Sequence, residues 1–380
     1  MPQGGAAVTA PVTWRASGAE RSGAWLSPSS PAPRRIGEAD DRTTAAAALA
    51  RVRGGEALVY SGDFRNARQL LAAMARRLRG RPPAVRDPAA LYRAEREVRR
   101  REHDLLSRVL VPIEDGLRVP LRHAPGAAAL AIAEALGPEP GVPGLLPLRD
   151  LLGMIGAHEW RRKGVAVPAL GAAVHPHYGV YAPVRGEYVD LVAQAARAWP
   201  VSGKRALDVG TGTGVLALLL ARAGARVVAT DLERRAVVCA RENAERLGLA
   251  AELDVVEADL FPAEGTFELV VSNPPWLPDA ARTPLERAVY DPGGALLERL
   301  VLGVEARLAP GGEAWIVISD LAELLGLRPP GHVAALAARA GLRAADVLEA
   351  RPSHPRAKDP DDPLHAYRAR EVTRLFRLVR

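Results

Sequence analysis

The chain has 380 residues, of which 48% are hydrophobic and 25% are charged, as in an ordinary soluble globular protein. This length suits about two domains, because a single core usually stops growing at about 250–300 residues. The sequence contains no uninterrupted apolar run near the roughly 20 residues that cross a bilayer, so we expect no membrane partner.

A formal net charge of +7, carried almost entirely by arginine, is compatible with a nucleic-acid partner. One basic run covers residues 93–102. Within it, Glu95 precedes Arg99 by four residues, a spacing that stabilises exposed helices through ion pairs. Glu97 and Arg101 repeat this interval. We therefore favour a solvated helix here and keep nucleic-acid binding as an alternative.

Residues 1–41 lack the compact apolar segment of a secretory signal and are rich in Arg, Ser, Ala and Pro. An organellar transit peptide has a similar composition. Because the whole chain shares this bias, we expect a disordered N-terminal tail instead.

Residues 42–170 are expected to form a mainly helical N-terminal domain. Apolar residues recur at helical spacing in two segments, 67–78 and 103–117. Two short strands are expected as well, at 56–61 and 117–122.

From about residue 200, short apolar runs alternate with helical patterns. Such alternation predicts an α/β fold over residues 175–380, a doubly wound, mostly parallel, Rossmann-like sheet with helices on both faces. No helical pattern separates the last two runs, 344–350 and 371–379, so we expect an antiparallel edge strand. The other expected strands are 205–210, 226–231, 251–259, 267–275 and 312–320.

Cys239 is the only cysteine, so the chain cannot form an intrachain disulfide. This usage fits a reducing, cytoplasmic setting. Cys239 lies on a helical pattern between apolar neighbours, so we expect a small core residue and not a nucleophile.

A glycine-rich loop, DVGTGTG at residues 208–214, follows the first strand of the predicted sheet. Gly210, Gly212 and Gly214 allow a tight turn and the close approach of a ligand to the backbone. The dinucleotide pattern G-x-G-x-x-G would require glycine at Val215, so the loop disfavours NAD and FAD.

Carboxylates occupy the ends of the first three strands. Asp208 precedes the glycines, where it can orient the loop or accept a hydrogen bond from a cationic amino group. Asp231 can accept hydrogen bonds from both hydroxyls of a ribose, and Asp259 can accept one from an adenine amine. Together with a glycine loop that has no lysine, these carboxylates favour a positively charged nucleoside over a nucleotide phosphate.

The fourth strand runs into a corner with the sequence VVSNPPWLP, residues 270–278. Two adjacent prolines make this corner stiff, so Asn273 and Trp276 are presented at a fixed angle. A plain turn at Asn273 and a core position for Trp276 are the alternative.

The motifs ALDVGTGTGVLAL, VVATDLE, VEADLF and VVSNPPW, in this order and spacing, resemble those of class I S-adenosylmethionine-dependent methyltransferases. They are most similar to the amino-methylating branch with an (Asn/Asp)-Pro-Pro-aromatic motif. The resemblance implies S-adenosylmethionine as the cofactor, with Asp208 and the glycines at its methionine part, Asp231 at the ribose and Asp259 at the adenine. The implied cofactor residues are Asp208, Gly210, Thr211, Gly212, Gly214, Asp231, Leu232, Asp259, Leu260 and Asn273.

Methyl transfer to nitrogen is an in-line displacement, so catalysis is mostly positioning. The Asn273 side-chain oxygen and the Pro274 carbonyl can each accept an N–H, which directs the nitrogen lone pair towards the methyl group. Pro275 stiffens the corner, and Trp276 can supply a flat face for a planar acceptor. The family more often has Tyr or Phe at the position of Trp276, which leaves the shape of the acceptor open.

Release-factor-type glutamine methyltransferases carry a P-R-P-E-T-E segment upstream of the glycine loop, at about the place of residues 178–192 here. Pro183, Arg185 and Glu187 are similar in type to that segment. This similarity, with the N-terminal domain as a recognition domain, implies a protein glutamine substrate. Tyr290 and Asp291, on the loop after the corner, are further candidate substrate contacts.

Other acceptors share the same motif. An exocyclic amine of a base in DNA or RNA would suit the basic charge, and a small-molecule amine is a third alternative. A non-catalytic cofactor-binding or RNA-binding protein ranks last, because we would then expect a damaged Asn-Pro-Pro corner, and the corner is intact. His175 and His177 have no accompanying Cys or acidic cluster, so we expect a structural loop there and no metal.

Overall fold

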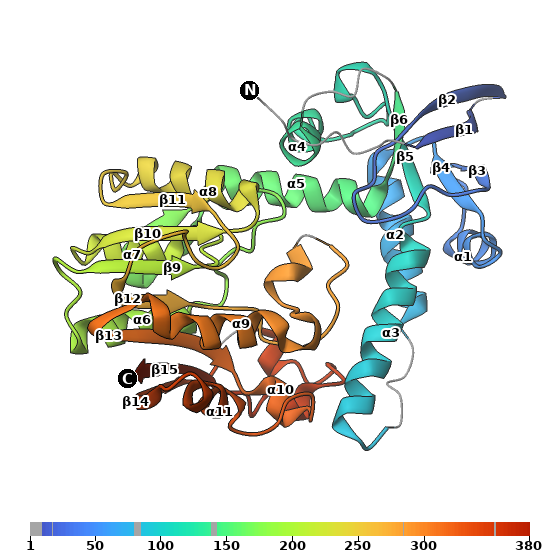
Figure 1. Cartoon of the computed structure of the whole chain (residues 1–380). Helices are drawn as coiled ribbons and strands as arrows, with labels where there is room; N and C mark the ends of the chain where they lie inside the picture. Colours follow the sequence, from blue (N-terminus) through green and yellow to red (C-terminus); the bar gives the residue numbers. More distant parts are fainter. Residues whose placement is uncertain (1–9, 17, 80–84, 138–142, 284, 353–354) are drawn as a thin grey trace. The chain divides into compact units, whose positions relative to one another are not determined.

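The structure, a computed structural model, describes residues 10–16, 18–79, 85–137, 143–283, 285–352 and 355–380. Its contacts divide the chain into two compact units (Figure 1). The first unit contains Met1–Ala84 and Arg93–Glu159, and the second contains Val85–Tyr92 and Trp160–Arg380. Among the described helices, none combines the length and apolar character that a bilayer crossing needs.

A six-stranded mixed sheet forms the centre of the first unit, in the order β1-β2-β6-β5-β4-β3. Trp14, Val59 and Leu145 belong to its buried apolar core. The strands are β1 (Pro11–Ala16), β2 (Ala19–Trp25), β3 (Ile36–Ala39), β4 (Ala57–Tyr60), β5 (Val109–Ile113) and β6 (Gly144–Pro147). The helices are α1 (Ala45–Arg53), α2 (Phe64–Leu78), α4 (Ala128–Leu136) and most of α3 (Pro88–Leu106) and α5 (Leu148–Lys163).

The expectation of a disordered tail over residues 1–41 is wrong where the structure describes that segment. It supplies β1, β2 and β3, and residues 1–9 lie outside the described residues. Val12 and Trp14 are buried and alternate with exposed neighbours, which is the period of a half-buried strand. The overall Ala, Arg and Pro bias hid this short alternation.

Helical residues outnumber strand residues in the first unit, as a mainly helical domain predicts, but the helices accompany a sheet that was not expected. The strand expected at 56–61 is β4. Residues 117–122 do not form a strand, since Leu117 ends a 3-10 turn. The first unit ends at Glu159 and not near residue 170.

The basic helix α3 carries the two ion pairs expected from its sequence. Arg99 pairs with Glu95, and the Arg101 Nε lies 2.8 Å from a Glu97 carboxylate oxygen. The interpretation of this stretch as a helix with internal ion pairs is confirmed, although Glu95 itself is buried.

A seven-stranded sheet forms the second unit, in the order β11-β10-β9-β12-β13-β15-β14. The first five strands run parallel, and β15 runs antiparallel to both β13 and β14, which confirms the predicted sheet and its antiparallel edge. The strands are β9 (Arg205–Val209), β10 (Arg226–Asp231), β11 (Leu253–Glu257), β12 (Phe267–Ser272), β13 (Leu308–Ser319), β14 (Arg343–Ala350) and β15 (Thr373–Val379).

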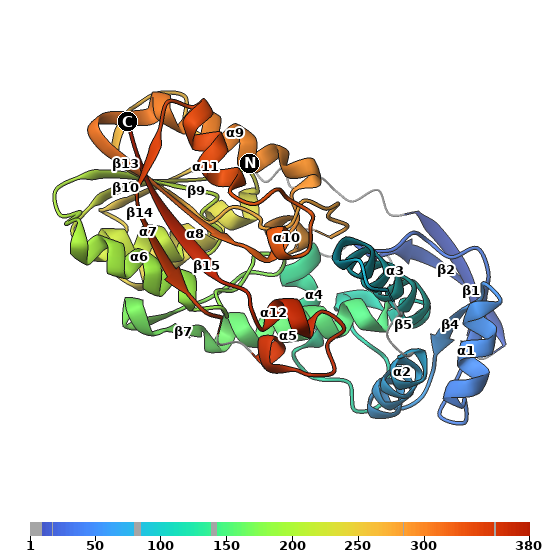
Figure 2. The ribbon, with the colours of Figure 1, turned by 90° about the horizontal axis from the view of Figure 1, so that it is seen from below.

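Helices cover both faces of this sheet, which Figure 2 shows from its side. Ala206 and Trp315 point to one face and pack with α6, α7 and α8. Their neighbours Leu207 and Ile316 point to the other face and pack with α9 and α11. The period of two along each strand therefore fills two cores. The helices are α6 (Glu187–Ala198), α7 (Val215–Arg222), α8 (Arg234–Arg246), α9 (Ala295–Val304) and α11 (His332–Arg339).

Short elements complete the second unit. They are the hairpin β7 (Val165–Val167) and β8 (Ala172–Val174), and the single-turn helices α10 (Leu321–Leu324) and α12 (His365–Arg368).

Candidate functional site

Two loops begin side by side at the centre of the seven-stranded sheet. Strand β9 lies between β10 and β12, so the strand order changes direction there. Val209 and Ser272 are register partners at the ends of β9 and β12, and the Ser272 hydroxyl donates a hydrogen bond of 2.8 Å to the Val209 carbonyl. Ligands of such sheets bind in the crevice outside the strand ends at this switch point. The glycine loop and the Asn-Pro-Pro-Trp corner therefore start from neighbouring strands.

The glycine loop adopts a conformation that side chains disfavour. Gly210, Gly212 and Gly214 have φ values of 74°, 57° and 83°. A β-carbon at Gly210 or Gly212 would meet no atom within 4 Å, so open space lies beside the loop. At Gly214 it would lie 3.1 Å from the Ala240 β-carbon. The first two glycines thus leave room for a ligand, and the third allows α7 to pack on α8.

Asp208 forms hydrogen bonds with the glycine loop and with the first turn of α7. Its Oδ2 accepts hydrogen bonds from the Thr211 hydroxyl at 2.6 Å and from the Ala217 backbone N–H at 3.1 Å. Burial raises the pKa of Asp208 to about 7, against the opposing effect of these two hydrogen bonds. The sequence suggested two roles for Asp208, to orient the loop or to accept a hydrogen bond from a cationic amino group. These contacts correspond to the first role.

Asp231 ends β10 beside the same loop. One of its oxygens accepts a hydrogen bond from the Gly212 N–H and the other from the Glu233 N–H, both at 2.9 Å. Burial raises the pKa of Asp231, and these backbone donors lower it. Each oxygen keeps a second lone pair, so the carboxylate can still accept two more hydrogen bonds. The next residue, Leu232, has 64% of its surface exposed.

Asp259 and Leu260 follow β11, the third strand of this half of the sheet. The Asp259 carboxylate is exposed and pairs with the Arg299 guanidinium at 2.7 Å. An adenine amine would have to share it with that cation. Leu260 has a φ of 65°, and its carbonyl accepts a hydrogen bond of 2.6 Å from the Thr230 hydroxyl.

The corner after β12 is largely buried. Pro274 and Pro275 are buried, and Trp276 packs against the cores on both faces of the sheet. The Trp276 indole N–H donates a hydrogen bond of 2.9 Å to the Asn273 Oδ1 atom. This contact was not expected from the sequence, where the Asn273 oxygen and the Trp276 ring had separate roles.

The structure shows which groups of the chain surround Pro183 and Arg185, the two expected substrate contacts. Pro183 is buried. Arg185 donates hydrogen bonds to Glu187 at 2.7 Å and to Glu371 at 2.9 Å, and its guanidinium carbon lies 4.6 Å from the centroid of the Trp276 ring. Arg185 is thus bound to two carboxylates and one ring of its own chain. Glu371 precedes β15 and lies 186 residues away in sequence, so no local pattern could have revealed it.

Asp291, another expected substrate contact, bonds the backbone of its own chain. It is buried, and its two oxygens accept hydrogen bonds from the Leu296 and Leu297 N–H groups at 2.9 and 3.0 Å. It therefore caps the first turn of α9, where a carboxylate is stabilised by the helix dipole. Tyr290 is partly buried in an apolar cluster that includes Leu277.

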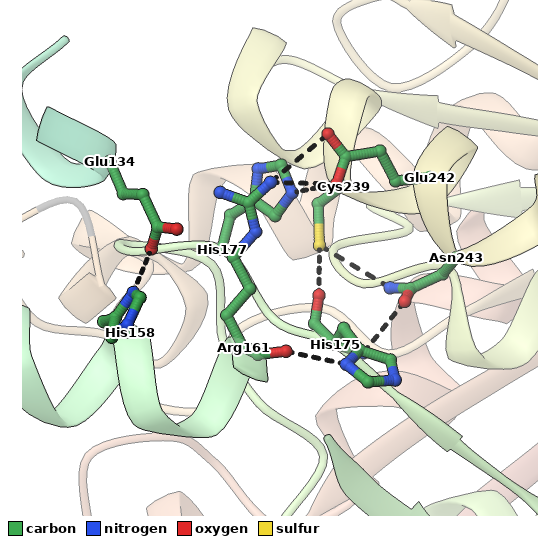
Figure 3. A network of polar contacts seen from close by, with 8 residues as sticks. All are labelled: Glu134, His158, Arg161, His175, His177, Cys239, Glu242 and Asn243. Carbon is green, nitrogen blue, oxygen red and sulfur yellow. Dashed lines mark hydrogen bonds and ion pairs between the residues drawn. The ribbon is translucent and has the colours of Figure 1, made fainter. Parts of the chain in front are cut away.

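Polar contacts fix the loop around His175 against α8 (Figure 3). The His177 Nε2 lies 2.9 Å from a Glu242 oxygen, which also pairs with Arg161 at 3.0 Å. The Asn243 Oδ1 accepts a hydrogen bond of 2.8 Å from the His175 N–H. Both histidines thus contribute to a structural network, and the described residues contain no group of three side chains arranged to hold a metal.

The same network includes Cys239 (Figure 3) and also reaches the glycine loop. The Asn243 Nδ2 donates a hydrogen bond of 3.0 Å to the Thr213 carbonyl. Cys239 is fully buried and donates a hydrogen bond to the His175 carbonyl, which confirms its place in the core. The α8 side chain Asn243 therefore supports the glycine loop in addition to Asp208.

Comparison with known proteins agrees with this architecture. Residues 189–325 match the family Methyltransferase small domain. The chain is 45% identical over 125 residues to the release factor glutamine methyltransferase of Deinococcus radiodurans, which covers 30% of this chain and 44% of that protein. It is 35% identical over 155 residues to the ribosomal RNA small subunit methyltransferase C of Chromohalobacter salexigens, which covers 39% of this chain and 42% of that protein.

Among solved structures, a ribosomal protein L11 methylase from Lactobacillus delbrueckii subsp. bulgaricus aligns with a TM-score of 0.36 and 19% identity, over 51% of this chain and 79% of that one. The chain spans less than half the length of the two relatives named above. Residues 189–325 therefore resemble a methyltransferase domain.

Proposed function

We propose that this chain transfers a methyl group from S-adenosylmethionine to the side-chain amide nitrogen of a protein glutamine. One observation carries the proposal. The glycine loop and the Asn-Pro-Pro-Trp corner leave adjacent strands at register partners Val209 and Ser272. A cofactor on the first loop and a planar nitrogen on the second would then meet at one sheet edge.

The residues around the glycine loop fit the cofactor. Open space beside Gly210 and Gly212 leaves room for it, and Asp231 keeps lone pairs for a pair of hydroxyls. Asp208 is buried nearby, and a cation beside it would favour its ionised form. Leu232 offers an exposed apolar side chain at the end of β10. Asp259 contributes least to this fit, because its carboxylate faces Arg299.

When bound, S-adenosylmethionine supplies a methyl group on a positively charged sulfur. Asn273 and Pro274 hold the acceptor nitrogen by its two N–H groups, through the side-chain oxygen and the backbone carbonyl. These acceptors stabilise the positive charge that develops on the nitrogen during transfer. The stiffness contributed by Pro275 keeps the two oxygens in place. The nitrogen loses a proton after transfer, so the chain needs no general base before it.

Two observations support glutamine as the acceptor. The relative from Deinococcus radiodurans is described as a release factor glutamine methyltransferase, and a similar match of 43% identity over 101 residues exists in Chlorobaculum tepidum. An amide also suits the corner, because its two N–H groups and its planarity match two fixed oxygens.

A base amine in RNA is the second candidate. It is favoured by the similarity to the ribosomal RNA methyltransferase and by the net charge of +7. A small-molecule amine would use the same two oxygens.

The acceptor can be identified with S-adenosylmethionine labelled in its methyl group. The full-length protein is incubated with host lysate and labelled cofactor, and the labelled polymer is then digested with protease or with nuclease. We expect protease to release the label and mass spectrometry to place one added methyl group on a glutamine. Release by nuclease would identify a nucleic acid, and label in the small-molecule fraction would identify a metabolite. Either result would overturn the glutamine assignment.

A further inference from the structure

The Asn273 amide has one orientation that can work in the proposed reaction. Its Oδ1 must face the acceptor N–H, whereas the opposite flip would present an NH2 group to another NH2 group. An amide side chain has nearly the same shape in both flips, so packing alone selects poorly between them. Some polar contact is needed to select the flip.

Trp276 provides that contact. Its indole N–H is a donor only, and it lies 2.9 Å from Asn273 Oδ1. In the opposite flip, Asn273 would point its own N–H groups at the indole N–H, so two donors would face each other. One Oδ1 lone pair is used by the indole and the other remains for the acceptor. Tyr or Phe at position 276 would have no ring N–H to do this.

Arg185 holds the indole ring in turn. Its guanidinium lies over the ring, 4.6 Å from the centroid, which is within the range of a cation–π contact. Ion pairs to Glu187 and Glu371 fix the guanidinium, and Glu371 also accepts a hydrogen bond of 2.7 Å from the Ser319 hydroxyl. The Glu371 side chain is fully buried. These contacts of Arg185 therefore join the segment before α6 to the end of β13 and the start of β15.

We propose that Trp276 and Arg185 are positioning residues, which rests on the function proposed above. Trp276 selects the Asn273 flip that accepts the substrate N–H, and Arg185 keeps the indole in the plane where its N–H can do so. One face of Trp276 is covered by Arg185, so the ring is part of the device that orients Asn273. Its role is not limited to stacking with the acceptor.

Nuclear magnetic resonance of the indole N–H groups tests the contact without any assay of activity. Two other tryptophans serve as references: Trp315 is buried and donates to Glu313 at 2.7 Å, whereas Trp160 is 46% exposed. Single Trp-to-Phe substitutions assign the three resonances. We expect the Trp276 N–H to exchange with solvent slowly, like that of Trp315, and to shift in Asn273→Ala. Exchange as fast as that of Trp160, or no shift in Asn273→Ala, would overturn the proposal.

A double-mutant cycle tests the selection of the flip. Trp276→Phe keeps an aromatic ring under Arg185 but removes the N–H, and we expect kcat to fall about 5- to 10-fold, the effect of one hydrogen bond. In an Asn273→Asp background both oxygens are acceptors, so the same substitution should change kcat less than about twofold. An equal loss in both backgrounds would show that Trp276 acts in another way. If the Asp background has no activity, the resonance experiment decides the question.

Arg185→Lys supplies the conservative control. It keeps a charge between Glu187 and Glu371, so the fold is retained, but it loses the planar group over the ring. We expect a smaller fall in kcat than for Trp276→Phe, with unchanged affinity for S-adenosylmethionine. Suppose that the wild-type protein binds the cofactor and transfers methyl groups. A Trp276→Phe variant with the same kcat would then overturn this inference but not the proposed function. A wild-type protein that does neither would overturn the proposed function.

Discussion

The glycine loop and the Asn-Pro-Pro-Trp corner begin at paired residues but are built in different ways. Contacts over short sequence distances shape the loop, since Asp208 bonds Thr211 and Ala217, three and nine residues away, and Asn243 reaches the Thr213 carbonyl from 30 residues away. The corner depends on distant segments, because Trp276 is covered by Arg185, which is anchored by Glu371. The half of the site that faces the cofactor can therefore be recognised from a short sequence motif. The half that faces the acceptor depends on contacts between segments that are far apart in the sequence.

This difference implies that the two halves can be damaged separately. A change in the loop should affect cofactor binding or stability, and a change in the corner should affect transfer.

Replacing Asp231 with Ala should abolish stabilisation by the cofactor. A ligand at 100 times its Kd stabilises a protein by about 2.7 kcal/mol, which a thermal shift detects. Asp259→Ala is the matched control, because that carboxylate is exposed and already paired with Arg299. This variant should keep more of the stabilisation by the cofactor. If neither the ligand nor the Asp231 substitution changes the melting temperature, the result would contradict the cofactor assignment.

The ligand-free protein should lose stability as pH rises because of Asp208. Burial raises its pKa from 3.8 to about 7, so the folded state binds more protons than the unfolded state between these values. The stability contributed by this group is full below pH 4 and is lost as pH rises through 7, by at most about 4 kcal/mol. Urea unfolding across this range should show a flatter profile for Asp208→Asn. Identical profiles for the two proteins would refute the assignment to Asp208.

Alanine at two positions of the loop should separate packing from ligand access. Gly214→Ala combines a φ of 83° with a 3.1 Å contact to Ala240, and we expect a loss of about 2–3 kcal/mol in urea unfolding. Gly212→Ala has the strain of a φ of 57° but no close contact, so its loss should be about 1–2 kcal/mol. Gly212→Ala should still weaken cofactor binding. The reverse order of stability losses would contradict the packing role of Gly214.

Cys239 should resist thiol reagents in the folded protein. Its side chain is fully buried, and burial raises the pKa of its thiol to about 11, so little thiolate exists near pH 8. A colorimetric thiol assay should show no reaction until denaturant unfolds the chain. Rapid labelling under native conditions would contradict this placement.

Sequence reasoning recovered the catalytic sheet because its signals are local. Each strand from β9 to β13 is a short apolar run, and the loop glycines need positive φ values that the sequence displays directly. The antiparallel edge was also predictable, because the segment between β14 and β15 has no long helical pattern and forms only short turns of helix such as α12. The strands of the first unit were not, except β4, because most are short and lie within a composition dominated by Ala and Arg.

The candidate site could be predicted only in part. Motif order placed Asp208 and Asn273 near the ends of the first and fourth strands, and the structure adds that these strands are neighbours. The role of Asp291 as a helix cap and the ion pairs of Arg185 depend on which distant backbone and carboxylate groups surround them. Asp259 shows the same limit, since Arg299 comes from a helix 40 residues later. These contacts could not be predicted from residue type alone.

Methyl transfer by Asn273→Ala tests the central claim most directly. The variant is supplied with a concentration of labelled S-adenosylmethionine that saturates it by calorimetry, together with host lysate, and transfer is compared with that of the wild type. Removing one preorganised group of this kind typically costs about 100- to 1,000-fold in rate, so we expect transfer to fall by that factor while cofactor binding persists. Wild-type transfer by the saturated variant would contradict the account of the corner as the acceptor half of the site.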